Sequence, residues 1–194
     1  MDANGRWLSF KATGVYGVEP LSFDWRARMS VMLGMWVVAR DGHAHGEGWG
    51  GAKLWGIRGV AQRSGPDVLA MQVIRNVAEL AWAPELAERE PALSWIDAGA
   101  GTFEIETEAA GRDVSVRFDI DARGDVTSAR SAARPYDVPE GFETSPWRCD
   151  FSEHRDFGGV RLPARAVATY EFEDEPWEYF RAEVTSVERE PPTT

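Results

Sequence analysis

Hydrophobic and polar positions follow two different periods along this chain, and the longer period is confined to one segment. Between Ser64 and Glu90, apolar residues recur every three or four positions, which places them on one stripe of an α-helix. The stripe consists of Val73, Ile74, Val77, Leu80 and Ala81. We therefore predict one main helix over residues 64–90.

Both ends of this helix carry local signals. Ser64 is a capping type of residue, and Pro66 and Asp67 follow it at positions where the first turn tolerates proline and favours an acid. Pro84 lacks an amide hydrogen and clashes with the preceding turn, so we expect it to bend or end the helix.

The rest of the chain alternates with the period of two that is typical of strands. In residues 21–29, one face carries Leu21, Phe23, Trp25, Ala27 and Met29. Further strands are predicted at 7–13, 31–39 (buried on both faces), 52–61, 93–97, 102–109, 112–121, 125–133, 147–157, 160–173 and 177–188. A glycine-rich turn is predicted at 41–51 and a proline-containing loop at 134–146.

Strands joined by short turns form an antiparallel meander, and a single helix between them must bury its apolar stripe on the sheet. We therefore predict an α+β, mainly β fold, in which a curved antiparallel sheet (half-barrel) wraps over one main helix. Residues 1–189 are expected to form a single half-barrel domain, and residues 190–194 a disordered tail.

Composition narrows the functional classes. The net charge of −11 without a basic block argues against nucleic-acid binding, and the single cysteine excludes an internal disulfide. There is no signal-peptide pattern and no apolar run of membrane-spanning length, so we predict a cytoplasmic protein without a transmembrane segment. Nine tryptophans indicate an aromatic-lined cleft, or simply a core filled with large rings.

Several segments together resemble an uncharacterised bacterial family of unknown function. Its pattern matches Phe23, Trp25 and Ala27; Asp41 with Gly46 and Gly48; Arg75, Glu79, Trp82 and Pro84; Trp95 and Asp97; Pro146 and Trp147; Gly159 and Pro163; and Trp177, Tyr179 and Phe180. The resemblance covers about residues 5–188. That family is similar to lipoprotein-carrier half-barrels, which implies a cavity for a lipid or another apolar molecule.

Arg75 and Glu79 are the first candidates for a functional site. Their spacing lets them pair on the helix surface, beside Trp82 on the same stripe. If the sheet covers this face, the buried pair could perform acid–base chemistry or hold a polar headgroup. The alternative is a structural ion pair between helix and sheet.

Two further groups of residues are candidates. Arg134, Trp147, Trp177 and Tyr179 come from separate strands and are expected to line one rim of the cavity, or else to pack across strands. Asp41, His43, His45 and Glu47 alternate as metal ligands on one strand face would, although the glycines among them favour a turn that scatters them. No metal or other cofactor is predicted.

The leading hypothesis is a protein that binds a small apolar or amphipathic, lipid-like molecule between sheet and helix. One alternative is a cofactor-independent enzyme that uses Glu79 as acid or base and Arg75 to hold an anionic substrate. The other is a structural or interaction module.

Overall fold

The computed structural model describes residues 7–32 and 34–189, and most of its strands belong to two antiparallel sheets. The first sheet has five strands in chain order, each paired with the next. They are β1 (Phe10–Gly17), β2 (Ser22–Met32), β3 (Met35–Ala44), β4 (Glu47–Leu54) and β5 (Arg58–Ser64). The sheet is therefore a simple meander.

The second sheet has seven strands in the order β14-β13-β10-β9-β8-β7-β6. They are β6 (Ser94–Asp97), β7 (Thr102–Ala109), β8 (Arg112–Ile120), β9 (Val126–Val138), β10 (Gly141–Ser152), β13 (Arg165–Glu171) and β14 (Pro176–Glu183). Two short strands, β11 (Arg155–Asp156) and β12 (Arg161–Leu162), follow β10 in the chain and precede β13. They pair only with each other.

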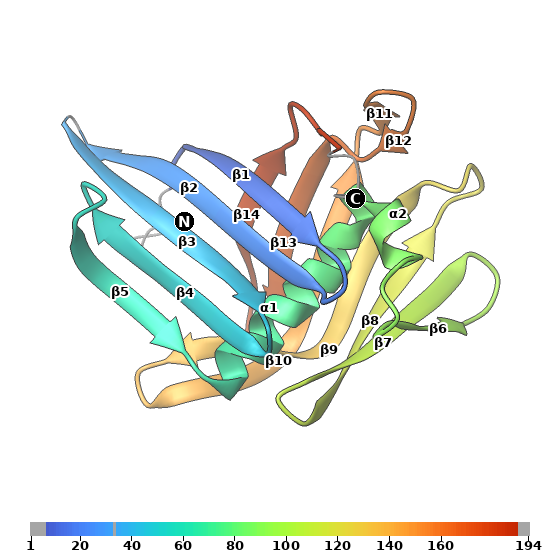
Figure 1. Cartoon of the computed structure of the whole chain (residues 1–194), viewed down its shortest axis with the longest axis horizontal. Helices are drawn as coiled ribbons and strands as arrows, with labels where there is room; N and C mark the ends of the chain where they lie inside the picture. Colours follow the sequence, from blue (N-terminus) through green and yellow to red (C-terminus); the bar gives the residue numbers. More distant parts are fainter. Residues whose placement is uncertain (1–6, 33, 190–194) are drawn as a thin grey trace.

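The main helix, α1 (Pro66–Glu79), connects the two sheets and runs between them (Figure 1). It contacts β3, β4 and β5 on one side and β7, β8 and β9 on the other. A 3₁₀ turn (Leu80–Trp82) and the short helix α2 (Pro84–Ala87) follow. The predicted helix over 64–90 is thus three pieces, because Pro84 cannot donate a backbone hydrogen bond and begins a new helix.

The helix begins where its sequence signals place it, although Ser64 does not cap it. Gly65 is the N-cap residue, no side chain donates or accepts a capping bond, and Pro66 occupies the first turn. Asp67 is bound by Arg112 of β8 instead, at 2.6 Å. This ion pair fastens the first turn of α1 to the seven-stranded sheet.

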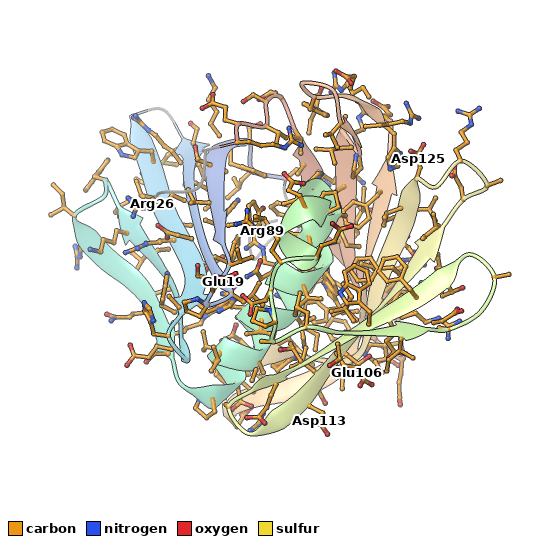
Figure 2. All side chains as sticks on the ribbon, turned by 45° about the vertical axis from the view of Figure 1, so that its right-hand side comes forward. Glu19, Arg26, Arg89, Glu106, Asp113 and Asp125 are labelled. Carbon is orange, nitrogen blue, oxygen red and sulfur yellow. The ribbon has the colours of Figure 1, made fainter. Side chains whose placement is uncertain are left out.

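The apolar core lies between α1 and the seven-stranded sheet. The predicted stripe of Val73, Ile74, Val77, Leu80 and Ala81 is buried in it, together with Ile105, Val116, Phe118, Ala129 and Phe151 from the strands. Figure 2 shows side chains filling the space around the helix.

The two sheets also meet each other at one edge, where β1 and β14 lie side by side. The ring of Phe180 in β14 stacks on Phe10 of β1 with centroids 5.3 Å apart and packs edge-on against Trp25 of β2 at 6.2 Å. A mainly β fold with antiparallel strands around one main helix is therefore confirmed. All strands of the described residues except β11 and β12 divide between two sheets that curve about α1.

The predicted glycine-rich turn at 41–51 is wrong, because the glycines belong to paired strands. The chain reverses at His45 and Gly46 alone, both with positive φ, and β3 and β4 pair on either side. A Cβ on Gly48 would lie 2.4 Å from the Cα of Leu69, the fourth residue of α1. Gly48 therefore permits close packing of strand and helix.

Several other boundaries differ from the sequence predictions. The single buried strand over 31–39 is interrupted by the turn between β2 and β3, and the strand over 52–61 by the turn at Trp55 and Gly56. The predicted loop at 134–146 consists mostly of the long ends of β9 and β10, which pair from Arg134 to Ser145. Pro146 is accommodated there because the register shifts between Ser145 and Trp147, which leaves it without a partner in the ladder.

Among the described residues, no helix is long and apolar enough to cross a membrane. The predicted tail at 190–194 lies outside the described residues.

Candidate functional site

One side of α1 carries a buried polar stripe that faces the five-stranded sheet. Gln72, Arg75, Asn76 and Glu79 form it, at spacings that share one helix face. Gln72, Asn76 and Glu79 are buried, and the side chain of Arg75 is only 13% exposed. Because water no longer solvates these groups, their protein partners decide what the stripe can do.

Arg75 is the centre of this stripe. Its Nε donates to Glu79 Oε1 at 2.7 Å, and its Nη1 donates to Oδ2 of Asp41 in β3 at 3.3 Å. The hydroxyl of Tyr16 in β1 donates to Glu79 Oε2 at 2.7 Å. Both carboxylate oxygens of Glu79 are therefore engaged by protein donors.

The surroundings of these groups favour fixed protonation states. Burial would lower the pKa of Arg75, but the carboxylates of Glu79 and Asp41 raise it overall. Burial, followed by the charge of Glu79, raises the pKa of the Tyr16 hydroxyl well above its usual value. Burial also raises the pKa of Asp41, against the opposing effect of Arg75. The guanidinium thus remains charged.

Aromatic rings enclose the same guanidinium. Its carbon lies 4.9 Å from the ring centroid of Phe23, 4.7 Å from Trp25 and 5.7 Å from Phe180. Arg75 therefore links the helix to strands of both sheets by charge and cation–π contacts. With its carboxylates already bound, the arrangement matches the structural ion pair that was the alternative for these residues.

Further along the stripe, polar contacts are less complete. Asn76 Nδ2 lies 2.9 Å from His43 Nε2, and Gln72 donates to the backbone oxygen of Trp49 at 3.3 Å. Burial lowers the pKa of His43 to about 4, so the imidazole is neutral at pH 7. Gln72 Oε1, Asn76 Oδ1 and Trp49 Nε1 are buried without a hydrogen-bond partner among the described residues.

The four candidate metal ligands are dispersed. Asp41 binds Arg75 and His43 meets Asn76, whereas His45 and Glu47 are exposed at the turn between β3 and β4. Across residues 7–32 and 34–189, no group of three or more His, Cys, Asp or Glu side chains is arranged to hold a metal ion.

The four candidate rim residues are brought together on β9, β10 and β14 of the seven-stranded sheet. Arg134 is buried, donates to Tyr170 and Tyr179, and lies over the Trp147 ring at 5.0 Å. Trp147 Nε1 donates to Tyr179 at 3.0 Å, and Trp177 lies 5.4 Å from the Tyr179 ring. Tyr170, which sequence reasoning missed, connects them, because it accepts a hydrogen bond from Arg134 and lies 5.3 Å from the Tyr179 ring. Its hydroxyl donates to the Pro135 oxygen at 2.7 Å.

Trp82 lies apart from both groups. Its ring meets Phe151 edge-on at 5.5 Å within the apolar core, and its Nε1 donates to the Pro163 oxygen at 2.9 Å. The 3₁₀ turn after Glu79 rotates it away from the polar stripe. Cys149, also a core residue, has its thiol pKa raised by burial.

A pocket opens beyond the end of α1, on the side of the seven-stranded sheet. It is partly enclosed, with a volume of about 140 Å³. Its apolar wall comprises Leu80, Ala81, Pro84, Ala87, Trp95, Phe103, Ile105, Phe118, Val126, Leu162 and Pro163. The rings of Trp95, Phe103 and Phe118 stack in succession across β6, β7 and β8, at 5.2 and 4.8 Å.

Three polar residues share the lining of this pocket: Asp125, His154 and Arg161. Asp125, which Figure 2 shows at one end of the sheet, accepts three hydrogen bonds of 2.8–3.0 Å from Arg161, and these hold its pKa below the usual value. His154 Nδ1 lies 3.9 Å from Asp125 Oδ2. His154 Nε2 is buried and has no partner in the described part of the chain.

Over nearly its whole length, at residues 1–182, the chain matches the model of a family described as a family of unknown function, DUF6544. The chain belongs to this family. Membership of an uncharacterised family, which the sequence motifs predicted, is confirmed. Among curated proteins and solved structures, comparison with this DUF6544 member gives no significant match.

The sequence predicted a cavity between sheet and helix, but none of the residues predicted to bind the ligand lines the pocket of this DUF6544 protein. Pro84, Trp95 and Pro163, which are among the residues on which the sequence resemblance rests, do line it. Two sequence features could have indicated the pocket: Gly124 and Asp125 in the turn before β9, and Pro163 after β12. Both are also typical of ordinary loops. Of the polar stripe, helical spacing indicated Arg75 and Glu79, but not Gln72 or Asn76.

Proposed function

We propose that this protein binds a small apolar or amphipathic molecule in the pocket between the seven-stranded sheet and the end of α1. The observation that carries the proposal is the pocket itself, a concave apolar surface with three polar groups. Small-molecule sites usually combine such a lining with a few polar groups that orient the ligand. The resemblance of the family to lipoprotein-carrier half-barrels, which the sequence motifs suggest, implies the same class of ligand.

The volume limits what can enter. A cavity of about 150 Å³ lined by aliphatic and aromatic side chains accommodates benzene, and this pocket has about 140 Å³. The buried part of the ligand is therefore a single ring or a short alkyl chain. A longer molecule has to extend past the open side.

The polar side chains define the other end of the ligand. Arg161 already neutralises Asp125, so neither offers an unpaired charge. His154 Nε2 lacks a partner, and its Nδ1 side is turned to Asp125. The imidazole therefore favours a ligand with a hydroxyl or another hydrogen-bonding group next to its apolar part.

Amide NMR titration with toluene and p-cresol tests the proposal, because the two probes share a ring and differ by one hydroxyl. We expect saturable shifts at pocket residues such as Ile105 and Val126 with both probes. A hydrogen bond between its hydroxyl and His154 should give p-cresol an affinity about threefold to tenfold higher than that of toluene. Replacement of His154 by Phe removes that advantage while toluene still binds.

Variants at two alanines provide the matched controls. Ala87→Leu adds three carbons at a buried position of the pocket lining and should weaken the binding of both probes. Ala132→Leu makes the same change at an exposed position of β9 outside the pocket and should leave both affinities unchanged. Absence of saturable shifts in the parent protein, or equal effects of the two variants, contradicts the proposal.

A further inference from the structure

The face of the five-stranded sheet that points away from α1 is basic, although the chain as a whole is acidic. Residues 7–64 carry seven Lys and Arg against four Asp and Glu, whereas the whole chain has a net charge of −11. The charge is thus divided between the two sheets, and the first sheet has the positive share.

Strand register places the cations together. Lys11, Arg28 and Lys53 lie in one row across the sheet with Val38, because Lys11 pairs with Arg28, Arg28 with Val38, and Val38 with Lys53. Arg26 pairs with Arg40 in the next row. Ala27 lies between Arg26 and Arg28, and Ala39 lies beside Arg40; both alanines are buried against the interior, so these rows face outward. We call Lys11, Arg26, Arg28, Arg40 and Lys53 the basic face.

One acid accompanies the basic face on these rows and their neighbours. Asp24 accepts hydrogen bonds from Arg26 and Arg40. Within the described residues, Arg28 and Lys53 have no ion-pair partner, and Arg28 lies over the Trp36 ring at 4.6 Å. The basic face therefore retains unneutralised positive charge.

Large apolar side chains are exposed at one end of the same sheet. Met32 precedes the β2–β3 turn, and Trp55 and Ile57 form the β4–β5 turn; Ile57 is 86% exposed. The turns adjoin each other, because Trp55 donates from its backbone to Trp36 and from its indole to the Gly34 oxygen. Figure 1 shows both turns at the same end of the sheet. We call Met32, Trp55 and Ile57 the hydrophobic tip.

We propose that the hydrophobic tip and the basic face dock this protein onto an anionic lipid surface. Stable membrane attachment requires two signals, and here an insertable apolar tip adjoins a polybasic surface. An indole at the tip suits the headgroup level of a bilayer. Met32 and Ile57 cannot stack on bases, which favours lipid over nucleic acid. The proposal is independent of ligand binding in the pocket.

Cosedimentation with vesicles tests the proposal. The full chain should bind vesicles of phosphatidylcholine and phosphatidylglycerol in a two-to-one mixture, bind pure phosphatidylcholine far less, and dissociate at about 0.5 M salt. Each cation that is neutralised, as in Arg28→Gln, should weaken the partition coefficient by about fivefold. If the hydrophobic tip inserts into the bilayer, Ile57→Asp should lower the partition coefficient by about tenfold or more.

Ile96→Asp is the matched control, since Ile96 is also exposed, at 41%, but lies on β6 of the other sheet. This variant should bind vesicles as the parent does, and circular dichroism checks that all variants are folded. Absence of binding to anionic vesicles at low salt overturns the proposal, as do equal losses for Ile57→Asp and Ile96→Asp. Binding of a single-stranded oligonucleotide without binding of vesicles also overturns it.

Discussion

The ion pair of Arg75 and Glu79 makes a quantitative prediction, because both side chains are largely withdrawn from water, at 13% and 9% exposure. Replacing Glu79 by Met leaves the guanidinium with Asp41 at 3.3 Å as its remaining carboxylate partner. Breaking a buried pair costs about 3–5 kcal/mol. Since Asp41 compensates in part, we expect the free energy of unfolding to fall by about 3 kcal/mol.

The converse variant, Arg75→Met, leaves Glu79 and Asp41 without their cation. It should lower the free energy of unfolding by as much as Glu79→Met or more. In the double variant neither buried charge remains, and Asp41 is exposed enough, at 29% of its side chain, to be hydrated. Replacing both members of a buried pair by apolar groups is often neutral. The double variant should therefore be more stable than either single variant.

Urea unfolding of the four proteins, followed by tryptophan fluorescence and analysed by linear extrapolation, measures the coupling. We expect a coupling free energy of about 2 kcal/mol or more. For a chain of this size, the loss in Glu79→Met corresponds to about 6–12 °C in melting temperature. Single-variant losses of about 1 kcal/mol or less, as at exposed pairs, or simple additivity in the double variant would refute the reasoning.

Two further predictions concern the interface between α1 and the five-stranded sheet. Burial lowers the pKa of His43 to about 4, below the usual value of about 6.5. The contribution of neutral His43 to the free energy of unfolding is therefore complete above pH 6.5 and is lost as the pH falls towards 4; the loss is about 2 kcal/mol at pH 5. In His43→Leu, the urea midpoints measured at pH 7 and pH 5 should lie closer together than in the parent protein. An unchanged difference between the two midpoints would contradict this. Gly48→Ala places a methyl group against the backbone of Leu69 and should cost about 2–3 kcal/mol. Gly59→Ala, where the added group meets nothing within 4 Å, should be neutral; equal thermal stability of the two variants would contradict the packing argument.

Strands and helix were largely predictable, because their signals are local. Alternation at Phe23 and Ala27 indicates the buried face of β2, and three-to-four spacing at Val73 and Val77 indicates the apolar side of α1. Glycine was misleading, since the same residue serves a turn at Gly46 and close helix packing at Gly48. The two uses differ only in what lies opposite the missing side chain.

The candidate site was predictable in part, for the same reason. Arg75 and Glu79 are one helical turn apart, so their pairing follows from the sequence. Their partners Tyr16 and Asp41 come from β1 and β3, and the approach of those strands depends on the whole sheet. The pairing of Arg75 with Glu79 thus depends on residues close in the sequence, whereas the burial of the pair depends on strands far away in the sequence.

By itself, the sequence determined the elements, the polar and apolar sides of α1, and membership of its family. Only the tertiary structure decided that both sides of α1 are covered, each by a different sheet. It alone assembled the pocket, which joins the end of α1 to β7 and to His154, residues separated by long stretches of chain. Periodicity reports which side of an element avoids water, because that depends on neighbours one turn away. Which distant element covers that side depends on the packing of the complete chain.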